Sequence, residues 1–329
     1  MSRLPTLNIA VVQQPPVFLN LRASIALALT LVREAARDGA AIVVFPETWL
    51  PGYPIWVDEA PGVALWDHPP ADALFRHLFQ QSVDLSGPDL AGLRDLARAL
   101  GVEVIMGLHE RRGGSLFNTV ARFGAAGELS IHRKLMPTYG ERLIWAGADG
   151  STLASWPTPH GPMGALICWE HWMPLARAAQ HATGEVLHFA LWPGLGDIHH
   201  VASRHYAFEG QCFVAAAGCV LTRDDVLAGF DSCSTDARAR AMLESIPPER
   251  HLLKAGGSAV IAPDGGFVAG PAGVDVPVLH AAIDLDRVVE GRLRLDTSGH
   301  YSRPDVFELR VDRRPKGGVL FQDAVPTQE

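Results

Sequence analysis

Short apolar runs alternate with amphipathic stretches along the first half of the chain, and this alternation predicts an α/β fold. Residues 8–13 (NIAVVQ) and 41–45 (AIVVF) are almost uninterrupted apolar runs, which are typical of strands buried on both faces. Between them, residues 22–38 have the spacing of an amphipathic helix that ends at Gly39. Further strands are predicted at residues 102–108, 117–123, 129–132, 164–168, 186–192, 212–221, 258–262 and 278–285, and further helices at 88–100, 174–181 and 200–210.

The number of predicted strands exceeds what one flat sheet covered by helices requires, so we expect two stacked sheets with helices on the outside. Residues 222–254 are charged and irregular, and we interpret them as an insertion or surface loop. No Pro-, Gly- or Ser-rich segment separates the two halves, and no repeat of fixed period occurs. The chain, residues 1–329, is therefore predicted to form a single domain.

The composition is that of an ordinary globular protein. Of the 329 residues, 48% are hydrophobic and 19% are charged, which excludes a disordered or fibrous chain. The formal net charge is −8 and no Lys/Arg-rich block occurs, so nucleic acid and anionic membranes are unsuitable partners. No apolar stretch approaches the roughly 20 residues of a membrane span, and the first residues lack the pattern of a signal peptide. We therefore expect a soluble, cytoplasmic protein.

Three chemically reactive side chains lie where predicted strands end. Glu47 follows the run AIVVFP, Lys134 follows the run 129–132, and Cys168 closes the run GALIC. The carboxyl ends of strands in open α/β sheets carry the loops that form binding crevices, so the three side chains indicate one assembled site. Cys168 also lies just before a predicted helix, whose N-terminal dipole favours a thiolate.

Each of these residues also has a purely structural interpretation. A lone cysteine in a buried strand is usually a small apolar filler, and a lone lysine is usually solvated. Glu47 is equally compatible with a turn cap, and Glu141 with a pair to Arg142. No single residue decides between the interpretations. The other cysteines form no C-x-x-C pair and are expected to be structural: Cys212, Cys219 and Cys233.

Four longer motifs, taken together, resemble those of the nitrilase superfamily. They are FPETWLPGYP at residues 45–54, HRKLMPTYGER at 132–142, CWEHWMPL at 168–175 and DTSGHYSRPDVFEL at 296–309. The first three resemble the motifs of that superfamily's Glu–Lys–Cys triad, in the family's order. The fourth resembles the C-terminal motif of the nitrilase branch, and the resemblance as a whole extends over residues 6–309.

This resemblance implies a four-layer αββα sandwich and a role for each matching residue. Cys168 matches the nucleophile and Glu47 the general base. Lys134 matches the cation that stabilises the tetrahedral intermediates, and Glu141 matches a second glutamate that helps to hold the triad and the substrate. We expect that no cofactor is required, because the sequence contains no nucleotide-binding motif.

The residues after the cysteine distinguish two branches of the superfamily. Amidase-type members usually have Tyr or Asn where this chain has Trp169, followed by Asp where it has Glu170. Cys-Trp-Glu therefore resembles a nitrilase in the strict sense, while His171 stands where many nitrilases have Asn. The implied reaction is hydrolysis of an organic nitrile to the carboxylic acid and ammonia through a Cys-linked thioimidate and thioester. An amidase or carbamoylase of the same superfamily is the alternative.

A nitrile is small and forms weak hydrogen bonds, so we expect an apolar pocket with few polar groups. From the aromatic residues in or near the motif loops, we predict that the pocket is lined by Tyr53, Trp169, His171 and Trp192. A metal site is disfavoured, because its candidate ligands match no metal-binding spacing: His199, His200, His205 and Glu209. An inactive scaffold is disfavoured too, because all four catalytic-type residues are present. Nucleotide-binding glycine motifs are absent from the sequence.

The resemblance also implies assembly, because members of the superfamily dimerise and nitrilases proper often extend into spirals. We therefore expect a homodimer or a larger homo-oligomer, with contacts formed by the irregular segments 55–70 and 222–254. Residues 310–329 are predicted to form a short C-terminal tail.

Charge sets the resting state of the predicted nucleophile. Glu47, Glu141 and a Cys168 thiolate would bring three negative charges to one positive charge on Lys134. At 4 Å and an effective dielectric constant near 20, each like-charge contact costs about 4 kcal/mol. We therefore expect resting Cys168 to be mostly a thiol that ionises in concert with proton transfer to Glu47.

Overall fold

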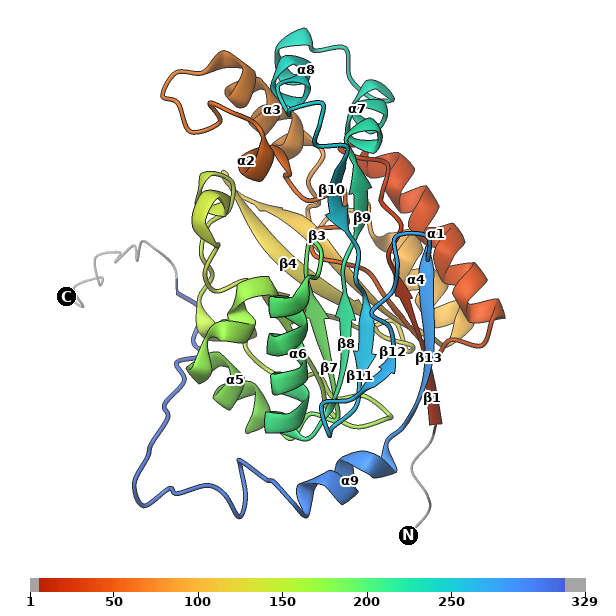
Figure 1. Ribbon diagram of the computed structural model, residues 1–329, viewed down its shortest axis with the longest axis vertical. Coiled ribbons are helices and arrows are strands. Elements are labelled where there is room, and N and C mark those ends of the chain that lie inside the picture. Colours follow the sequence, from red (N-terminus) through yellow and green to blue (C-terminus); the bar gives the residue numbers. More distant parts are fainter. Residues whose placement is uncertain (1–5, 317–329) are drawn as a thin grey trace, which may run out of the picture.

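Two sheets lie face to face in the computed structural model, which describes residues 6–316 (Figure 1). The first sheet has the strand order β13-β1-β2-β3-β4-β5 and the second has the order β12-β11-β8-β7-β6. The strands of the first sheet are β1 (Thr6–Val12), β2 (Ile42–Val44), β3 (Glu103–Arg112), β4 (Ser115–Phe123), β5 (Leu129–Arg133) and β13 (Val278–Asp284). Those of the second are β6 (Met163–Ile167), β7 (Leu187–Leu191), β8 (Phe213–Ala217), β11 (Ala259–Ile261) and β12 (Phe267–Ala269). A separate pair is formed by β9 (Val220–Thr222) and β10 (Leu252–Ala255).

Period-two alternation in the central strands explains why the sheets stack. In β1, Ile9 and Val11 belong to the core between the two sheets, whereas Ala10 and Val12 belong to the core beneath the helices of the first sheet. Successive strand side chains point to opposite faces, so a strand that is apolar at every position has two faces to bury. Strands β1, β2 and β3 run parallel to one another, as do β6, β7 and β8. Parallel strands of this kind are typically buried on both faces.

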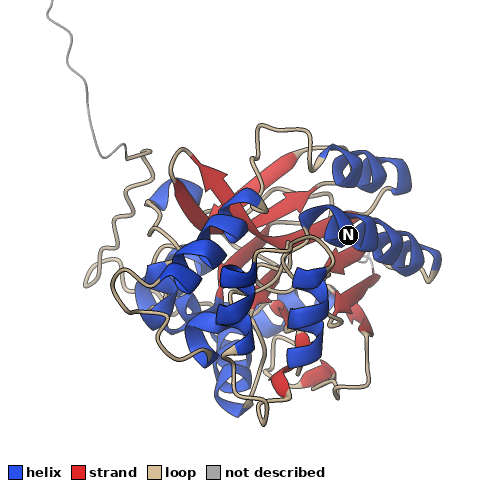
Figure 2. Cartoon of the chain, turned by 90° about the horizontal axis from the view of Figure 1, so that it is seen from above, coloured by secondary structure: helices blue, strands red, loops and turns tan. Residues whose placement is uncertain are grey.

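Helices cover the outer face of each sheet and complete the four-layer αββα sandwich that the resemblance implies (Figure 2). On the first sheet, α1 (Leu21–Arg37) and α4 (Ala91–Leu100) contribute buried side chains to one core. On the second sheet, α5 (Pro174–His181) and α6 (Asp197–Gly210) contribute to the other. The remaining helices are α2 (Trp56–Glu59), α3 (Pro69–Gln80), α7 (Arg223–Asp231), α8 (Ala237–Glu244) and α9 (Asp286–Arg292), with the 3-10 helices η1 (Tyr139–Leu143), η2 (Gly150–Thr152) and η3 (Cys168–Trp172).

The interpretation of residues 222–254 as irregular is wrong. The segment folds into α7, α8 and strand β10, and α8 packs against α3. Its polar residues cap the helices: Thr222 and Asp225 form a reciprocal capping box at the start of α7, and the Asp236 side chain accepts hydrogen bonds from the start of α8. The single strand predicted at 212–221 is also interrupted, because the chain leaves the sheet at Gly218 and re-pairs as β9. Helices α3 and α9 were not predicted.

An extended arm follows α9 and runs along the outside of the molecule (Figure 1). Residues 293–316 contain no helix or strand, and the arm returns to the body where the backbone N–H of Lys316 donates to Asp149. The arm includes the motif at 296–309. Of the predicted tail, residues 310–316 belong to this arm and residues 317–329 lie outside the described part of the chain. No helix between residues 6 and 316 is long and apolar enough to cross a membrane.

The loop after β2 passes very close to β3 at Gly107. A Cβ atom at Gly107 would lie 2.1 Å from the carbonyl oxygen of Pro46 and 2.5 Å from the nitrogen of Thr48. We expect Gly107→Ala to lower the free energy of unfolding by about 1–3 kcal/mol, because the loop must move away. Gly114→Ala, where no atom lies within 4 Å of the added carbon, is the control and should change it by less than about 0.5 kcal/mol in denaturant titrations. Equal effects of the two substitutions would contradict this explanation.

Candidate active site

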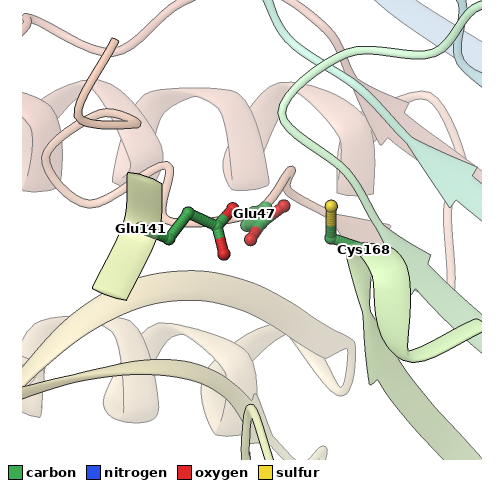
Figure 3. Close-up of side chains that lie close together, drawn as sticks. All are labelled: Glu47, Glu141 and Cys168. Atoms are coloured by element: carbon green, nitrogen blue, oxygen red, sulfur yellow. The ribbon is translucent and has the colours of Figure 1, made fainter. Parts of the chain in front are cut away.

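The four sequence-predicted catalytic side chains meet where the strands of both sheets end. Glu47 lies in the loop after β2, Lys134 directly follows β5, and Cys168 directly follows β6. Glu141 comes from η1. All four are buried, with at most 3% of each residue exposed. Figure 3 shows the Glu47 carboxylate between the Glu141 carboxylate and the Cys168 thiol.

Hydrogen bonds fix the two carboxylates around one ammonium group. Lys134 Nζ donates to Glu47 Oε1 at 2.8 Å and to Glu141 Oε2 at 2.7 Å. Glu141 also accepts from the Tyr53 hydroxyl at 3.1 Å and from the backbone N–H of Thr138 at 2.7 Å. One acidic atom from each of Glu47, Glu141 and Cys168 lies within 4.8 Å of the other two. The thiol is therefore within one bridging group of both carboxylates.

Asn118 is a site residue that the sequence interpretation missed. This buried side chain in β4 donates from Nδ2 to Glu47 Oε1 at 2.6 Å. Lys134 donates to the same oxygen, so both donors bind Oε1. The second oxygen, Oε2, has no hydrogen-bond partner among the described residues. Oε2 is thus free to accept a proton. A polar residue at an inward position of the apolar strand 115–123 was a signal that could have identified Asn118.

Cys168 adopts a backbone conformation that L-residues rarely adopt, with φ at +54°. It begins η3, and its carbonyl oxygen accepts a hydrogen bond from Nδ1 of His171 at 2.7 Å. His171 therefore contacts the backbone of Cys168.

The cavity at Cys168 contains two of the four predicted pocket residues. Its volume is about 170 Å³, and both Tyr53 and Trp169 line it. His171 and Trp192 do not belong to its lining; they are buried and stack on each other, with ring centroids 5.0 Å apart. A larger hollow of about 460 Å³ lies elsewhere, over α2 and α3, and contains none of the four catalytic-type residues.

The cavity has more polar lining than the expected apolar pocket with few polar groups. Asp58, Lys254 and His199 also line the cavity, and Lys254 Nζ lies 3.0 Å from the Asp58 carboxylate. The same ammonium lies 5.1 Å from the centre of the Tyr53 ring. Lys254 comes from β10, in the segment misjudged as irregular, which is why the sequence did not place it here. Aromatic and charged side chains therefore line the cavity together.

The alternative metal site is not assembled. His199 accepts a hydrogen bond from the backbone of Gly196, and His200 bonds to the carbonyl of Gly257. Glu209 pairs instead with Arg177 at 2.7 Å. Within residues 6–316, the one cluster of metal-ligand type consists of Glu47, Glu141 and Cys168, and the Lys134 ammonium already bonds both of its carboxylates.

Residues 8–293, which are most of the chain, match the carbon–nitrogen hydrolase family. The chain belongs to this family. It is 36% identical over 337 residues to a nitrilase of Pseudomonas syringae, covering 97% of this chain and 94% of that protein. It is 37% identical over 311 residues to an aliphatic nitrilase of Sinorhizobium fredii, covering 94% and 97% of the two. A carbon–nitrogen hydrolase from Helicobacter pylori has the same fold, with a TM-score of 0.68, 20% identity, and coverage of 92% and 97%.

Burial and like charges determine the protonation of this carbon–nitrogen hydrolase's site. Burial raises the pKa of Glu47 to about 7, with the charge of Glu141 adding to the rise and Lys134 and Asn118 opposing it. Burial also raises the pKa of Cys168 well above its usual value, and the charge of Glu47 raises it further. For Lys134, burial alone would lower the pKa, but the acidic groups of Cys168, Glu47 and Glu141 outweigh burial and raise it. At neutral pH the cysteine is therefore a thiol beside a charged lysine.

The raised thiol pKa can be tested without any substrate. Alkylation of Cys168 by iodoacetamide depends on the thiolate, so its rate should still rise above pH 9. Lys134→Met should slow the reaction at every pH, because the Lys134 charge lowers the pKa of the thiol. Mass spectrometry of the Cys168 peptide measures the rate, with the buried Cys212 as internal control. A plateau reached below pH 6 would indicate a preformed thiolate and contradict the assignment.

Proposed function

We propose that the protein is a nitrilase that hydrolyses an organic nitrile to the carboxylic acid and ammonia. The observation that carries the proposal is the buried thiol of Cys168 beside a carboxylate, Glu47, whose Oε2 is free while Lys134 holds its Oε1. The motif Cys-Trp-Glu and the nitrilases that are 36–37% identical to this chain support nitrile rather than amide chemistry.

The first half of the reaction adds the thiol across the nitrile. Cys168 Sγ attacks the nitrile carbon while its proton passes to Glu47 Oε2, and Glu47 then gives that proton to the nitrile nitrogen, which yields a thioimidate and restores the carboxylate. A water molecule that loses its proton to Glu47 then adds to the same carbon. The nitrogen leaves as ammonia, and the acyl group remains on Cys168 as a thioester.

The second half hydrolyses the thioester. Another water molecule, activated by Glu47, adds to the carbonyl carbon, and Sγ leaves as the carboxylic acid is released. The balance is one nitrile and two waters for one carboxylic acid and one ammonia. Lys134 stabilises the charge that develops in both tetrahedral intermediates, while Glu141 holds the Lys134 ammonium in place.

The remaining predicted residues divide between substrate contact and support. Tyr53 and Trp169 line the cavity, and we assign them to substrate binding. His171 and Trp192 act on the substrate indirectly, because His171 holds the carbonyl of Cys168 and Trp192 packs against the His171 ring. The reaction as written uses no metal and no cofactor.

The alternative is an amidase or carbamoylase with the same four residues. Matched substrates distinguish the two activities. A nitrilase releases ammonia from the nitrile itself, whereas an amidase releases it only from the corresponding amide. A panel of aliphatic nitriles, arylacetonitriles, benzonitriles, dinitriles and cyanide, each beside its amide where one exists, decides between them.

Substitutions at the site should remove ammonia release from the best nitrile of that panel. Cys168→Ala should abolish turnover, because no covalent intermediate can form. Glu47→Gln and Lys134→Ala should each reduce kcat by at least about 10²–10⁴-fold, through lost proton transfer and lost charge stabilisation. Cys233→Ala, at an exposed cysteine that does not line the cavity, is the control and should keep kcat. Turnover of amides alone by the unsubstituted enzyme would overturn nitrile specificity while leaving the catalytic roles intact.

We further propose that the protein acts as a homodimer or a larger, spiral-forming homo-oligomer. Helix α6 exposes Ile198, Val201 and Phe208 on one face, each about half exposed, and the arm after α9 exposes Tyr301 and Phe307. Exposed apolar side chains that gather on one helix face are typical of interaction sites. We also propose that the protein is cytoplasmic, because the reaction requires Cys168 as a thiol and a reducing compartment keeps thiols reduced.

The assembly can be tested by light scattering after size-exclusion chromatography. The unsubstituted protein is expected to have at least twice the mass of one chain. Val201→Glu should lower that mass, because it places a charge on the exposed apolar face of α6. Leu100→Glu, a similarly exposed position at the end of α4, is the control. A monomer for the unsubstituted protein would overturn the proposal.

A further inference from the structure

One buried carboxylate near the site has no part in the reaction proposed above. Glu170 is 1% exposed, does not line the cavity and lies within η3, two residues after Cys168. A buried carboxylate is costly unless several donors satisfy it, so its contacts show what it does.

Glu170 connects the two segments that carry the lysine and the cysteine. Its Oε1 accepts from the backbone N–H of Leu135, the residue after Lys134, at 2.8 Å. Its Oε2 accepts from the backbone N–H of Ile167, the residue before Cys168, at 2.7 Å. The first segment continues β5 of one sheet and the second continues β6 of the other, and these two strands are not hydrogen-bonded to each other.

His132 completes the arrangement from within β5. Its Nε2 lies 3.0 Å and 3.2 Å from the two Glu170 oxygens. Burial alone would raise the pKa of Glu170, but His132 and the two backbone N–H groups outweigh burial and lower it. The carboxylate is therefore ionised, and both of its oxygens act as acceptors.

We propose that Glu170 is a positioning residue that sets the placement of Cys168 relative to Lys134 by binding the backbone beside each of them. The proposal rests on the proposed nitrile hydrolysis and adds to it a residue that touches neither substrate nor reacting atoms. Cys168 has the unfavourable φ of +54°, and the Glu170–Ile167 bond closes the turn directly before it. One rigid group thus holds both the strained turn and the end of the lysine strand.

The geometry requires a glutamate rather than a near relative. Glutamine would replace one acceptor oxygen with an NH₂ group, which would face a backbone N–H donor. Aspartate keeps both acceptors but is one methylene, about 1.5 Å, shorter. It can remain bonded to Ile167 or to Leu135, but not to both.

The test compares Glu170→Gln and Glu170→Asp with Glu103→Gln. Glu103 is equally buried and bonded to Arg122, but it lies at the start of β3, away from the cavity. A displacement of about 1 Å at the reacting groups can cost about 10²-fold in rate. We expect both Glu170 variants to lose about 10²-fold in kcat on a nitrile of the panel, with KM within about threefold. Glu103→Gln should lose thermal stability but keep kcat.

A second measurement reports the geometry directly and does not depend on turnover. Glu170→Asp retains the charge, so a change in the alkylation of Cys168 by iodoacetamide reports a change in distance. Because the Lys134 charge lowers the pKa of the thiol, separating the two groups should raise it and slow alkylation at pH 8. Because it uses Glu170→Asp, this measurement still tests the positioning role if Glu170→Gln does not fold.

The outcomes separate the two proposals. Glu170 variants that lose stability as Glu103→Gln does, yet keep kcat and the alkylation rate, would overturn the positioning role. If the unsubstituted enzyme releases no ammonia from any nitrile, the proposed function fails, and the alkylation rates of Glu170→Asp still decide the positioning role.

Discussion

The Lys134 ammonium is enclosed by protein and is bonded to two carboxylates at once, at 2.8 Å and 2.7 Å. Two buried carboxylates without such a counter-ion would repel each other and take up a proton. The position of Lys134 depends on β5, that of Glu47 on β2, and that of Glu141 on η1. The arrangement of the first sheet is therefore what brings the two carboxylates to one ammonium group, while the second sheet supplies the thiol and the Trp192 carbonyl that accepts from the Glu47 backbone N–H.

The loop after β2 must pass close to the sheet for this to happen. Leu50 donates from its backbone N–H to the carbonyl of Gly107, and the absence of a side chain at Gly107 permits the approach. Asn118 on the neighbouring strand then reaches Glu47 Oε1 and leaves Oε2 free. The fold thus sets the chemistry of Glu47 in two ways. The close approach of the loop to Gly107 places the carboxylate, and the Asn118 side chain determines which of its oxygens is free.

Much of this arrangement follows from the sequence, because apolar runs that end in Glu47, Lys134 or Cys168 mark the strand ends of both sheets. Helices α7 and α8 had signals in Thr222 and Asp236, which cap them, but their low apolar content concealed them. The direction of the His171 side chain could not be predicted, since it depends on the positive φ of Cys168. Lys254 reaches the cavity only through the folding of the segment around β10, which no local pattern encodes.

The charge of the site explains why the proton should move within it. Glu47, Glu141 and Lys134, all ionised, sum to −1, and a thiolate at Cys168 would bring the sum to −2 in a buried cavity. Transfer of the thiol proton to Glu47 keeps the sum at −1, and the raised pKa of Glu47, about 7, brings the carboxylate close to accepting it. Burial, which raises the pKa of the Cys168 thiol, thus favours attack that is coupled to proton transfer over a preformed thiolate. A site built around a His–Cys ion pair has the opposite balance, because there a cation faces the sulfur and no second carboxylate competes for it.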